Sequence, residues 1–196
     1  MTAAAGGNLV MCLDPATESA MLAAVPDMRA LALSLCHRRD CADDLVQEAL
    51  LRAISNISSF KPGTNMTAWL LTILRNNFLN ECRMSRRQVS DANEHFIATM
   101  TSQPDQEARL QFDDFRKALA QLPRDQRQAL VLVGGAGVSY EDAAKICRCA
   151  VGTVKSRVFR ARARLAKLMG LDSPQDLGPD RAIHAALACS DLRWAA

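Results

Sequence analysis

Basic and hydroxyl-bearing side chains gather in one stretch near the C-terminal end of this 196-residue chain. Between Lys145 and Gly170 there are eight basic residues and no acidic residue. Arginine and lysine can bind phosphate oxygens and guanine edges, and serine, threonine and phenylalanine can contact other base edges or the thymine methyl group. The side chains of these types are Thr153, Lys155, Ser156, Arg157, Phe159, Arg160, Arg162 and Arg164. They predict binding to duplex DNA, with a solvated basic face and a membrane-surface helix as alternatives.

The segments around this stretch predict a helix-turn-helix. A short helix is expected from Tyr140 to Ile146, a tight connection at 147–149 and a second helix from about Gly152. Ser139 followed by Asp142 resembles a capping box that would start the first helix. In a helix-turn-helix the second helix enters the major groove. Because no acidic residue lies on that second helix, the layout favours DNA binding over the two alternatives.

Apolar residues recur at three- and four-residue steps through most of the chain, and strand signals are nearly absent. This period is typical of helices that bury one face. One helix is expected from about Cys41 to Ile57, with Leu45 and Ala49 among the residues of its buried stripe. Its other side carries Asp44, Gln47, Glu48, Leu51 and Arg52. A Pro-Gly turn within Phe60–Asn65 precedes a second, long helix from about Thr67 to Arg87.

The charge distribution divides the chain into modules. Six acidic residues and a single basic one, Arg109, lie from Asp91 to Asp114, and the segment 89–104 is polar and aperiodic. Helices resume near Asp105, with breaks at Leu122-Pro123 and at Gly134–Gly137. The sequence therefore predicts an all-α fold of two small helical domains joined by a flexible acidic linker. The expected boundaries are 18–88 for the first domain, 89–106 for the linker, 107–170 for the second domain and 171–196 for a C-terminal extension.

The seven cysteines form an odd and scattered set, unlike the disulfide framework of a small secreted domain. Cys36, His37 and Cys41 make one cluster, and Cys147 with Cys149 makes another. Neither cluster has the ligand spacing of a structural zinc site. We expect reduced thiols in a cytoplasmic protein, no bound metal and no cofactor.

Membrane insertion, export and catalysis are disfavoured on separate grounds. The longest nearly uninterrupted apolar run, Ala129–Val138, is about half the length of a membrane span and contains three glycines. The first 28 residues contain no lysine or arginine, so the basic start of a secretory signal is missing. The glycines of 134–137 lack the Lys-Ser/Thr ending of a phosphate-binding loop, and no nucleophile with a neighbouring base stands out. We expect no membrane contact and no catalytic residue.

Three segments carry a resemblance: 43–49 reads DDLVQEA, 68–76 reads AWLLTILRN and 152–162 reads GTVKSRVFRAR. The last resembles the region-four signature of extracytoplasmic-function (group IV) sigma factors of bacterial RNA polymerase. The first resembles the region-two helix of that family that docks on the polymerase clamp, and the second its promoter-melting helix. Three motifs in this order cover roughly Leu22 to Gly170, so chance similarity is a poor explanation.

The resemblance implies a subunit that binds core RNA polymerase and directs promoter-specific transcription initiation, not an enzyme. It assigns polymerase binding to Asp44, Gln47, Glu48, Leu51 and Arg52, and minus-10 DNA contacts to Thr64, Asn65, Arg75 and Asn76. It assigns minus-35 DNA contacts to Thr153, Lys155, Ser156, Arg157, Phe159 and Arg160, and phosphate contacts to Arg162 and Arg164. The alternative role for Arg157, Arg162 and Arg164 is to bind phosphates or to pair with the acidic first helix of the helix-turn-helix. The alternative is a stand-alone helix-turn-helix regulator, which would need to dimerise and would have no use for the acidic docking helix.

More narrowly, Pro62–Asn65, the Arg86-Arg87 pair and Cys149–Thr153 resemble the general-stress-response (EcfG-like) branch of alphaproteobacteria. In that branch a small helical anti-sigma factor holds the sigma factor, and a response regulator with a sigma-like domain removes the inhibitor. The resemblance therefore implies an anti-sigma partner besides core polymerase and promoter DNA, and a role in stress-response transcription.

The sequence departs from the family at two places. Position 148 is usually glycine, because the turn of the helix-turn-helix tends to need a positive φ, so Arg148 is either strained or part of a different turn. The tail from Leu171 to Ala196 extends beyond the usual family end. It contains a possible short helix from Asp180 to Leu192, to which we assign no role.

Overall fold

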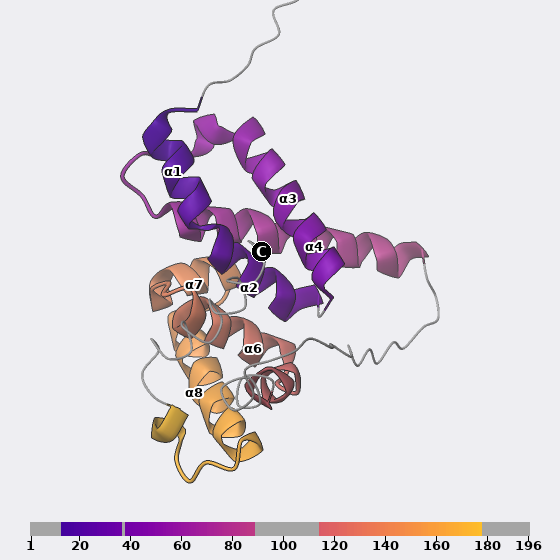
Figure 1. The fold of residues 1–196 in the computed structure, drawn as a ribbon, viewed down its shortest axis with the longest axis vertical. Coiled ribbons are helices and arrows are strands. Elements are labelled where there is room, and N and C mark those ends of the chain that lie inside the picture. Colours follow the sequence, from indigo (N-terminus) through magenta and orange to yellow (C-terminus); the bar gives the residue numbers. More distant parts are fainter. Residues whose placement is uncertain (1–12, 37, 89–113, 178–196) are drawn as a thin grey trace, which may run out of the picture.

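The structure is a computed structural model that describes residues 13–36, 38–88 and 114–177. These ranges contain helices and no strand, as the apolar periodicity predicts (Figure 1). In the N-terminal half the elements are α1 (Pro15–Ala23), α2 (Val25–Cys36), α3 (Arg39–Ser55), the 3-10 turn η1 (Ile57–Ser59) and α4 (Met66–Gln88). In the C-terminal half residues 114–120 are helical, followed by α6 (Arg124–Leu130), η2 (Val131–Gly135), α7 (Tyr140–Cys147), α8 (Val151–Leu168) and η3 (Pro174–Leu177).

Helices α1 to α4 form an N-terminal bundle in which α2 packs against both α3 and α4. Three large side chains of α2, Met28, Leu31 and Leu35, are buried in its core. The neighbouring helices add Leu45, Val46, Ala49 and Ala53 from α3 and Leu70, Leu71 and Leu74 from α4. Their three- and four-residue spacing puts these side chains on one face of each helix. Burial of that face is what holds the bundle together.

The predicted two-sided character of the helix over 41–57 is confirmed. Its apolar stripe is buried, whereas Asp44, Gln47, Leu51 and Arg52 are exposed and Glu48 is half-buried. The helix begins two residues earlier than expected, at Arg39, and ends at Ser55 before the short turn η1. Five side chains of the predicted polymerase-binding set therefore share the solvent side of α3.

The start of α4 is fixed by the turn that the Pro-Gly pair predicts. Gly63 has φ +85°, a backbone conformation that glycine adopts at little cost. The Thr64 hydroxyl donates a hydrogen bond to the Lys61 carbonyl at 2.7 Å. Asn65 then caps α4, because its Oδ1 accepts a hydrogen bond from the Ala68 N–H at 3.1 Å. The observed helix, Met66–Gln88, agrees with the expected one within a residue at either end.

The C-terminal module is built around α8, which packs against α6 and α7. Small and β-branched side chains line these contacts and let the helices approach closely. The buried set includes Ala129 and Leu130 on α6, Ala143 and Ile146 on α7, and Val154, Val158, Ala161 and Leu165 on α8. This core holds α8 with its basic side facing away from the module.

The expected break at Gly134–Gly137 is only partly correct. The chain does not leave the helical conformation at Gly134 but continues from α6 into η2, a π-helical turn that ends at Gly135. All five residues of η2 are buried, and η2 packs against α2. Glycine lowers helix stability by about 1 kcal/mol relative to alanine, and burial here outweighs that preference. The turn comes at Ala136 and at Gly137, which has φ +61°.

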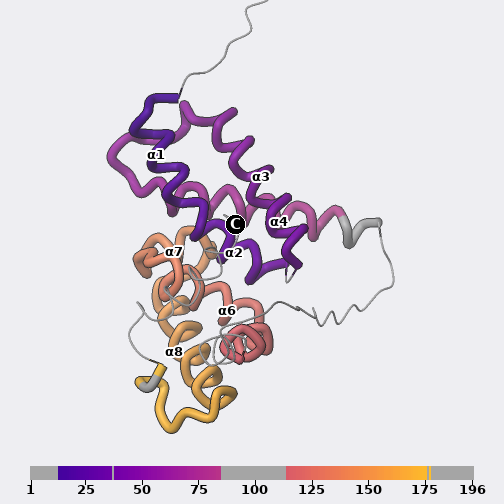
Figure 2. Tube along the Cα trace, in the orientation of Figure 1, coloured from indigo at the N-terminus to yellow at the C-terminus, as the bar shows by residue number. Residues whose placement is uncertain are grey.

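The two modules contact each other directly. The main contacts join α2 with α6 and η2, and α4 with α7. Figure 2 shows the indigo-to-magenta trace of the N-terminal bundle lying against the orange trace of the C-terminal module. The predicted acidic linker over 89–106 lies outside the described residues, as does the possible helix over 180–192. The contacts between the modules are therefore made by helices, far from each other in the sequence.

One helical segment near the N-terminus is strongly apolar. Pro15–Cys36 is long and apolar enough to cross a membrane, with a mean hydropathy of 1.3. In the structure it is two helices, α1 and α2, which join at Ala24. Met21, Met28 and Leu31 point into the bundle core. Packing in the bundle core accounts for part of the apolar character of this segment, of which 39% is buried.

Candidate nucleic-acid interface

The predicted helix-turn-helix is formed by α7 and α8. Ser139 caps α7, because its Oγ accepts a hydrogen bond from the Asp142 N–H at 3.0 Å. The carboxylate of Asp142 also accepts hydrogen bonds from the Ser139 hydroxyl and from the Lys145 ammonium. The hydrogen bond from Lys145, more than the one from Ser139, lowers the pKa of Asp142. The capping-box interpretation of residues 139–142 is therefore confirmed at Ser139.

The turn between the two helices keeps the left-handed conformation although its residue is not glycine. Arg148 has φ 52° and ψ 50°. The Cys149 N–H donates to the Ala144 carbonyl at 3.1 Å, which closes the turn in the manner of a Schellman motif. Of the two possibilities that the sequence left open, strain at Arg148 is the one observed, and the turn itself is unchanged.

The outward side of α8 carries the residues expected to read the minus-35 element. Lys155, Phe159 and Arg160 are exposed, and the ring of Phe159 keeps 71% of its surface accessible to solvent. Arg160 is oriented along the helix by hydrogen bonds from its guanidinium to the carbonyl and hydroxyl oxygens of Ser156, both at 3.2 Å. The Lys155 ammonium lies 5.8 Å from the centre of the Tyr140 ring. Two cations, a hydroxyl and an aromatic ring thus share one face.

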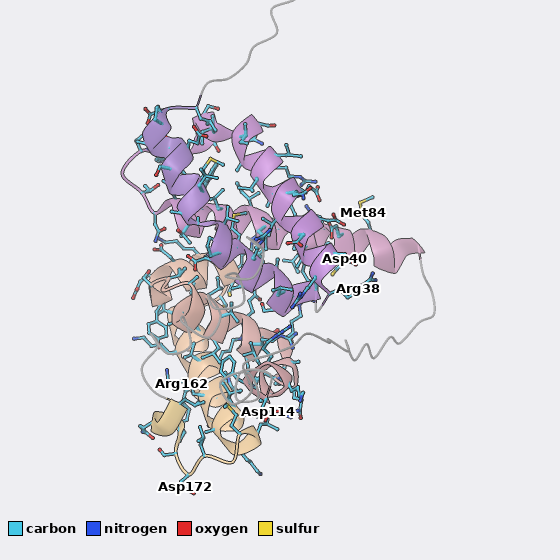
Figure 3. All side chains as sticks on the ribbon, in the orientation of Figure 1. Arg38, Asp40, Met84, Asp114, Arg162 and Asp172 are labelled. Carbon is cyan, nitrogen blue, oxygen red and sulfur yellow. The ribbon has the colours of Figure 1, made fainter. Side chains whose placement is uncertain are left out.

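Other members of the predicted DNA-binding set lie differently. Arg157 is largely covered and forms an ion pair with Asp125 of α6 at 2.7 Å, so it ties α8 to α6. Thr153 is half-buried near the start of α8. Arg164 is exposed toward the end of the helix, and Arg162 is half-buried and engaged within the protein. Figure 3 shows Arg162 on the α8 side of the C-terminal module. The outward face is therefore narrower than the full predicted set.

The solvent side of α3 forms the second candidate surface. Glu48 and Arg52, four residues apart, form an ion pair at 2.5 Å. Leu51 lies between them in sequence and is 66% exposed, so an apolar side chain stands beside the ion pair on this surface. Glu81 of α4 adds a carboxylate beside Glu48, and burial, followed by the hydrogen bond with Glu48, raises its pKa. Glu81 could not be predicted as part of this surface, because nothing in local spacing places α4 beside this part of α3.

A second large apolar side chain is exposed farther along α4. Met84 is 63% exposed, and Figure 3 shows it extending from α4 away from the bundle. Single exposed apolar residues are common on protein surfaces. Leu51 and Phe159 differ from Met84 because each lies within a predicted binding set. Helical periodicity finds all three, since each falls off the buried stripe of its helix.

The four residues expected to contact minus-10 DNA lie at two places, the N-terminus of α4 and its middle. Thr64 and Asn65 are exposed at the N-terminus of α4, and their side chains hold the turn and the cap described above. Near them the rings of Phe60 and Trp69 pack together, with centroids 5.2 Å apart. Arg75 and Asn76 lie further along α4, where α7 packs against it. The structure thus places two members of this set just before α4 and two in its middle, where α7 packs against the helix.

The cysteines do not form a metal-binding group in the described part of the chain. Cys36 and Cys41 lie within hydrogen-bonding reach of each other, and burial, followed by this contact, raises the pKa of Cys36. Cys147 is buried and Cys149 half-buried at the helix-turn-helix connection. Burial raises the pKa of the Cys147 thiol. The raised pKa keeps the thiols of Cys36 and Cys147 protonated and poorly reactive at neutral pH. His37 lies outside the described residues.

Comparison with known proteins agrees with the two-module architecture. Residues 21–88 match the family model "Sigma-70 region 2", and residues 112–165 match "Sigma-70, region 4". The chain is 56% identical, over 88% of its length, to 97% of the ECF RNA polymerase sigma factor EcfG of Rhodopseudomonas palustris strain TIE-1. It is 41% identical, over 63% of its length, to 68% of the ECF sigma factor SigC of Mycobacterium tuberculosis strain CDC 1551.

A solved structure extends this agreement to three dimensions. The sigma factor RpoE of Bartonella quintana, crystallised with the anti-sigma factor NepR, superposes with a TM-score of 0.71 at 46% identity. The match covers 82% of this chain and all of RpoE. CnrH, solved with the cytosolic domain of CnrY, shares the fold at a TM-score of 0.54. With both sigma-70 regions in order and a relative matched along nearly its whole length, the chain belongs to the extracytoplasmic-function RNA polymerase sigma factors.

Proposed function

We propose that this sigma factor contacts core RNA polymerase through the exposed side of α3 and reads the two promoter elements with different helices. The observation that carries the proposal is the outward side of α8. There a capped helix-turn-helix presents Lys155, Phe159 and Arg160 to solvent, with no acidic residue along the helix. A helix of this kind fits the major groove, and its cations match the phosphates on either side.

Duplex minus-35 DNA would be read by Lys155, Ser156, Phe159 and Arg160. Arg160 is the strongest candidate for a base contact, because Ser156 already holds its guanidinium in place and less freedom is lost on binding. Arg164 would bind phosphate, and Arg162 would do so where its internal contacts allow. Thr153 and Arg157 remain in the proposed set, with Arg157 acting by positioning α8 through Asp125.

Unpaired minus-10 DNA would be held by the N-terminal module. Asn65 and Thr64 border a short loop with Phe60 and Trp69, which offers an amide and an aromatic surface to an unstacked base. Arg75 and Asn76 would contact the same strand further along α4. Single-stranded DNA is commonly bound by this combination of stacking and cationic groups.

The test is run-off transcription with bacterial core RNA polymerase, the purified protein and a promoter bearing a GGAAC-like minus-35 element. The expected result is a transcript that depends on both the polymerase and the protein. Absence of a transcript, together with tight binding of the protein alone to duplex DNA, would support the stand-alone regulator instead.

Charge reversal on α3 separates polymerase binding from DNA binding. The double variant Asp44→Lys, Glu48→Lys is expected to lose transcription at least tenfold, because it reverses the charge of the proposed docking side. Its C-terminal module is unchanged, so duplex minus-35 binding should be retained. Glu18→Lys, on the exposed side of α1, is the matched control and should transcribe normally. Normal transcription by the double variant would contradict the docking assignment.

We also infer a partner and a role from the relatives. RpoE, which is 46% identical to this chain, was crystallised with the anti-sigma factor NepR. An anti-sigma factor of that kind, a small helical protein displaced by a response regulator with a sigma-like domain, is the proposed inhibitor here. The name EcfG of the relative from Rhodopseudomonas supports assignment to stress-response transcription.

The proposed organisation keeps the boundaries expected from the sequence. Residues 18–88 form the polymerase and minus-10 module, 89–106 the linker and 107–170 the minus-35 module, and 171–196 keep no assigned role. A protein of this kind works where the polymerase is, so we propose a cytoplasmic location. Its contribution is promoter choice and strand separation, and we assign it no catalytic activity of its own.

A further inference from the structure

Two consecutive residues of the helix-turn-helix connection bind two consecutive residues of α4. The Arg148 guanidinium donates a hydrogen bond to Oδ1 of Asn76 at 3.1 Å. In return, the Arg75 guanidinium donates to the carbonyl oxygen of Cys147 at 3.3 Å. Arg75 and Asn76 are the residues proposed to contact minus-10 DNA, and Cys147 and Arg148 belong to the module proposed to read the minus-35 element. One module therefore covers part of the DNA-binding surface of the other.

The backbone at this contact is unfavourable for the residue that occupies it. Arg148 is the one non-glycine residue with positive φ among those the structure describes. Residues with a Cβ atom rarely adopt this conformation, and where they do the strain often marks a functional position. The position suits glycine better, so arginine here has no advantage for the turn itself. Its side chain, which reaches Asn76, is what distinguishes it from glycine.

Two further arginines of the C-terminal module support the same packing. Arg124 lies over the ring of Phe78, within one helical turn of Arg75 and Asn76, with its guanidinium carbon 4.5 Å from the ring centre. Arg127 is buried and donates a hydrogen bond from Nε to the Ser34 carbonyl, near the C-terminal end of α2, at 2.7 Å. Cations are favoured at that end of a helix. The contact at Arg148 is therefore part of a continuous interface.

Some polar groups buried in this interface have no hydrogen-bond partner, and some of its charges repel each other. Nε and Nη1 of Arg75 are buried and have no hydrogen-bond partner among the described residues. Burial lowers the pKa of Arg75, and the positive charges of Arg148 and Arg124 lower it further. Buried N–H groups without partners are costly, and like charges repel. A negatively charged strand that supplied acceptors to Arg75 would relieve both penalties, so the closed arrangement is one that DNA can displace.

We propose that the Cys147-Arg148 connection is an intramolecular latch that covers Arg75 and Asn76 in the free protein and limits its binding to single-stranded DNA until the modules separate. The inference rests on the proposed function, because it takes Arg75 and Asn76 as minus-10 contacts. The latch explains why this chain has arginine at a position where the turn suits glycine. Polymerase binding that separates the two modules would then also expose Arg75 and Asn76 to the minus-10 strand.

The test compares the full-length wild-type protein with Arg148→Gly. Glycine fits the left-handed turn, so the variant should keep or raise the thermal stability of the fold while it removes the hydrogen bond to Asn76. The probe is a fluorescein-labelled single-stranded oligonucleotide carrying the non-template minus-10 sequence of the run-off promoter, followed by anisotropy. Because apparent affinity scales with the fraction of open molecules, Arg148→Gly is expected to bind about fivefold more tightly.

The sign of this change separates the latch from simple electrostatics. Loss of a positive charge by itself weakens binding to DNA. Lys167→Ala, which removes an exposed cation from the last turn of α8, is the matched control and should bind equally or more weakly. Hydrogen exchange of the α4 peptide containing Arg75 and Asn76 should also become faster in Arg148→Gly and stay unchanged in the control.

Failure of the latch and failure of the proposed function give different results. If the wild type and Arg148→Gly both support run-off transcription but bind the oligonucleotide with equal affinity, the latch is refuted and the function stands. If neither protein yields a transcript, the proposed function fails. In that case unchanged hydrogen exchange in Arg148→Gly would refute the latch as well. Tighter oligonucleotide binding together with faster exchange would still support the latch.

Discussion

Replacing Arg127 by methionine tests how much the buried guanidinium between the modules contributes to stability. Arg127 is 5% exposed, although arginine is almost never buried so fully without partners. Its Nε donates to the Ser34 carbonyl at 2.7 Å, and its Nη1 donates to the carbonyls of Ala120 at 2.9 Å and Leu122 at 3.4 Å. The side chain thus links α2 to the segment that precedes α6.

Two opposing effects decide the size of the change. Hydrogen bonds to charged groups contribute about 1.5–3 kcal/mol each, so the two short bonds of Arg127 contribute about 3–6 kcal/mol. Burial of the guanidinium opposes them and lowers the pKa of Arg127 to about 10. This decrease corresponds to a cost of about 3 kcal/mol, which methionine would remove. The hydrogen bonds exceed the burial cost by about 1.5 kcal/mol, so Arg127→Met should lower the free energy of unfolding by that amount. The variant leaves the carbonyl oxygens of Ser34 and Ala120 without this donor.

Thermal unfolding of the full-length protein measures this loss. For a chain of this size about 1.5 kcal/mol corresponds to a decrease in Tm of about 3–6 °C. Arg124→Met is the matched control, since Arg124 is exposed and its contact with Phe78 contributes less than about 1 kcal/mol. A Tm for Arg127→Met equal to or above that of the wild type would show that the burial cost exceeds the contribution of the hydrogen bonds.

Two further predictions concern α8 and α7. Arg160→Ala is expected to cost about 1–3 kcal/mol of discrimination at one minus-35 base pair, whereas Arg164→Ala should weaken all sequences alike and reduce the salt dependence, as measured by competition binding with single-base variants. A uniform loss for Arg160→Ala would make it a phosphate contact. Because the pKa of Asp142 is lowered in the folded protein, its stabilising effect should be present above the unfolded pKa of 3.8 and disappear as pH falls through the lower folded value. Urea unfolding between pH 3 and 7 should therefore show a difference between the wild type and Asp142→Asn that is largest at pH 7, and Lys145→Met should abolish most of it.

Local features of the sequence were sufficient to predict the helices around the site. The cap at Ser139, the turn at Gly63 and the exposed row of α3 follow from side-chain chemistry and from the 3.6-residue period, both of which act within a few residues. The outward position of Lys155, Phe159 and Arg160 follows from the same period. The assignment of the chain to its family rests on these local motifs as well, because the motifs coincide with the functional helices.

Contacts between distant residues could not be predicted in this way. Arg157 belongs to the predicted DNA-binding set, but a partner 32 positions away, Asp125, holds it against α6. Glu81 joins the α3 surface only because α4 packs across α3. The buried π-helical turn at Gly134 and Gly135 shows the same effect, since burial in the tertiary structure outweighs the local preference of glycine.

By itself, the sequence determined the helical modules, the capped helix-turn-helix and the side chains that a DNA-binding helix offers to solvent. Only the tertiary structure decided which of those side chains are free to act. Arg148 and Asn76 are 72 positions apart, and no spacing rule relates them. Their contact arises because α2 and α4 present a face onto which α6 and α7 pack, and the free energy of that packing places a strained arginine over the helix proposed to bind the opened promoter.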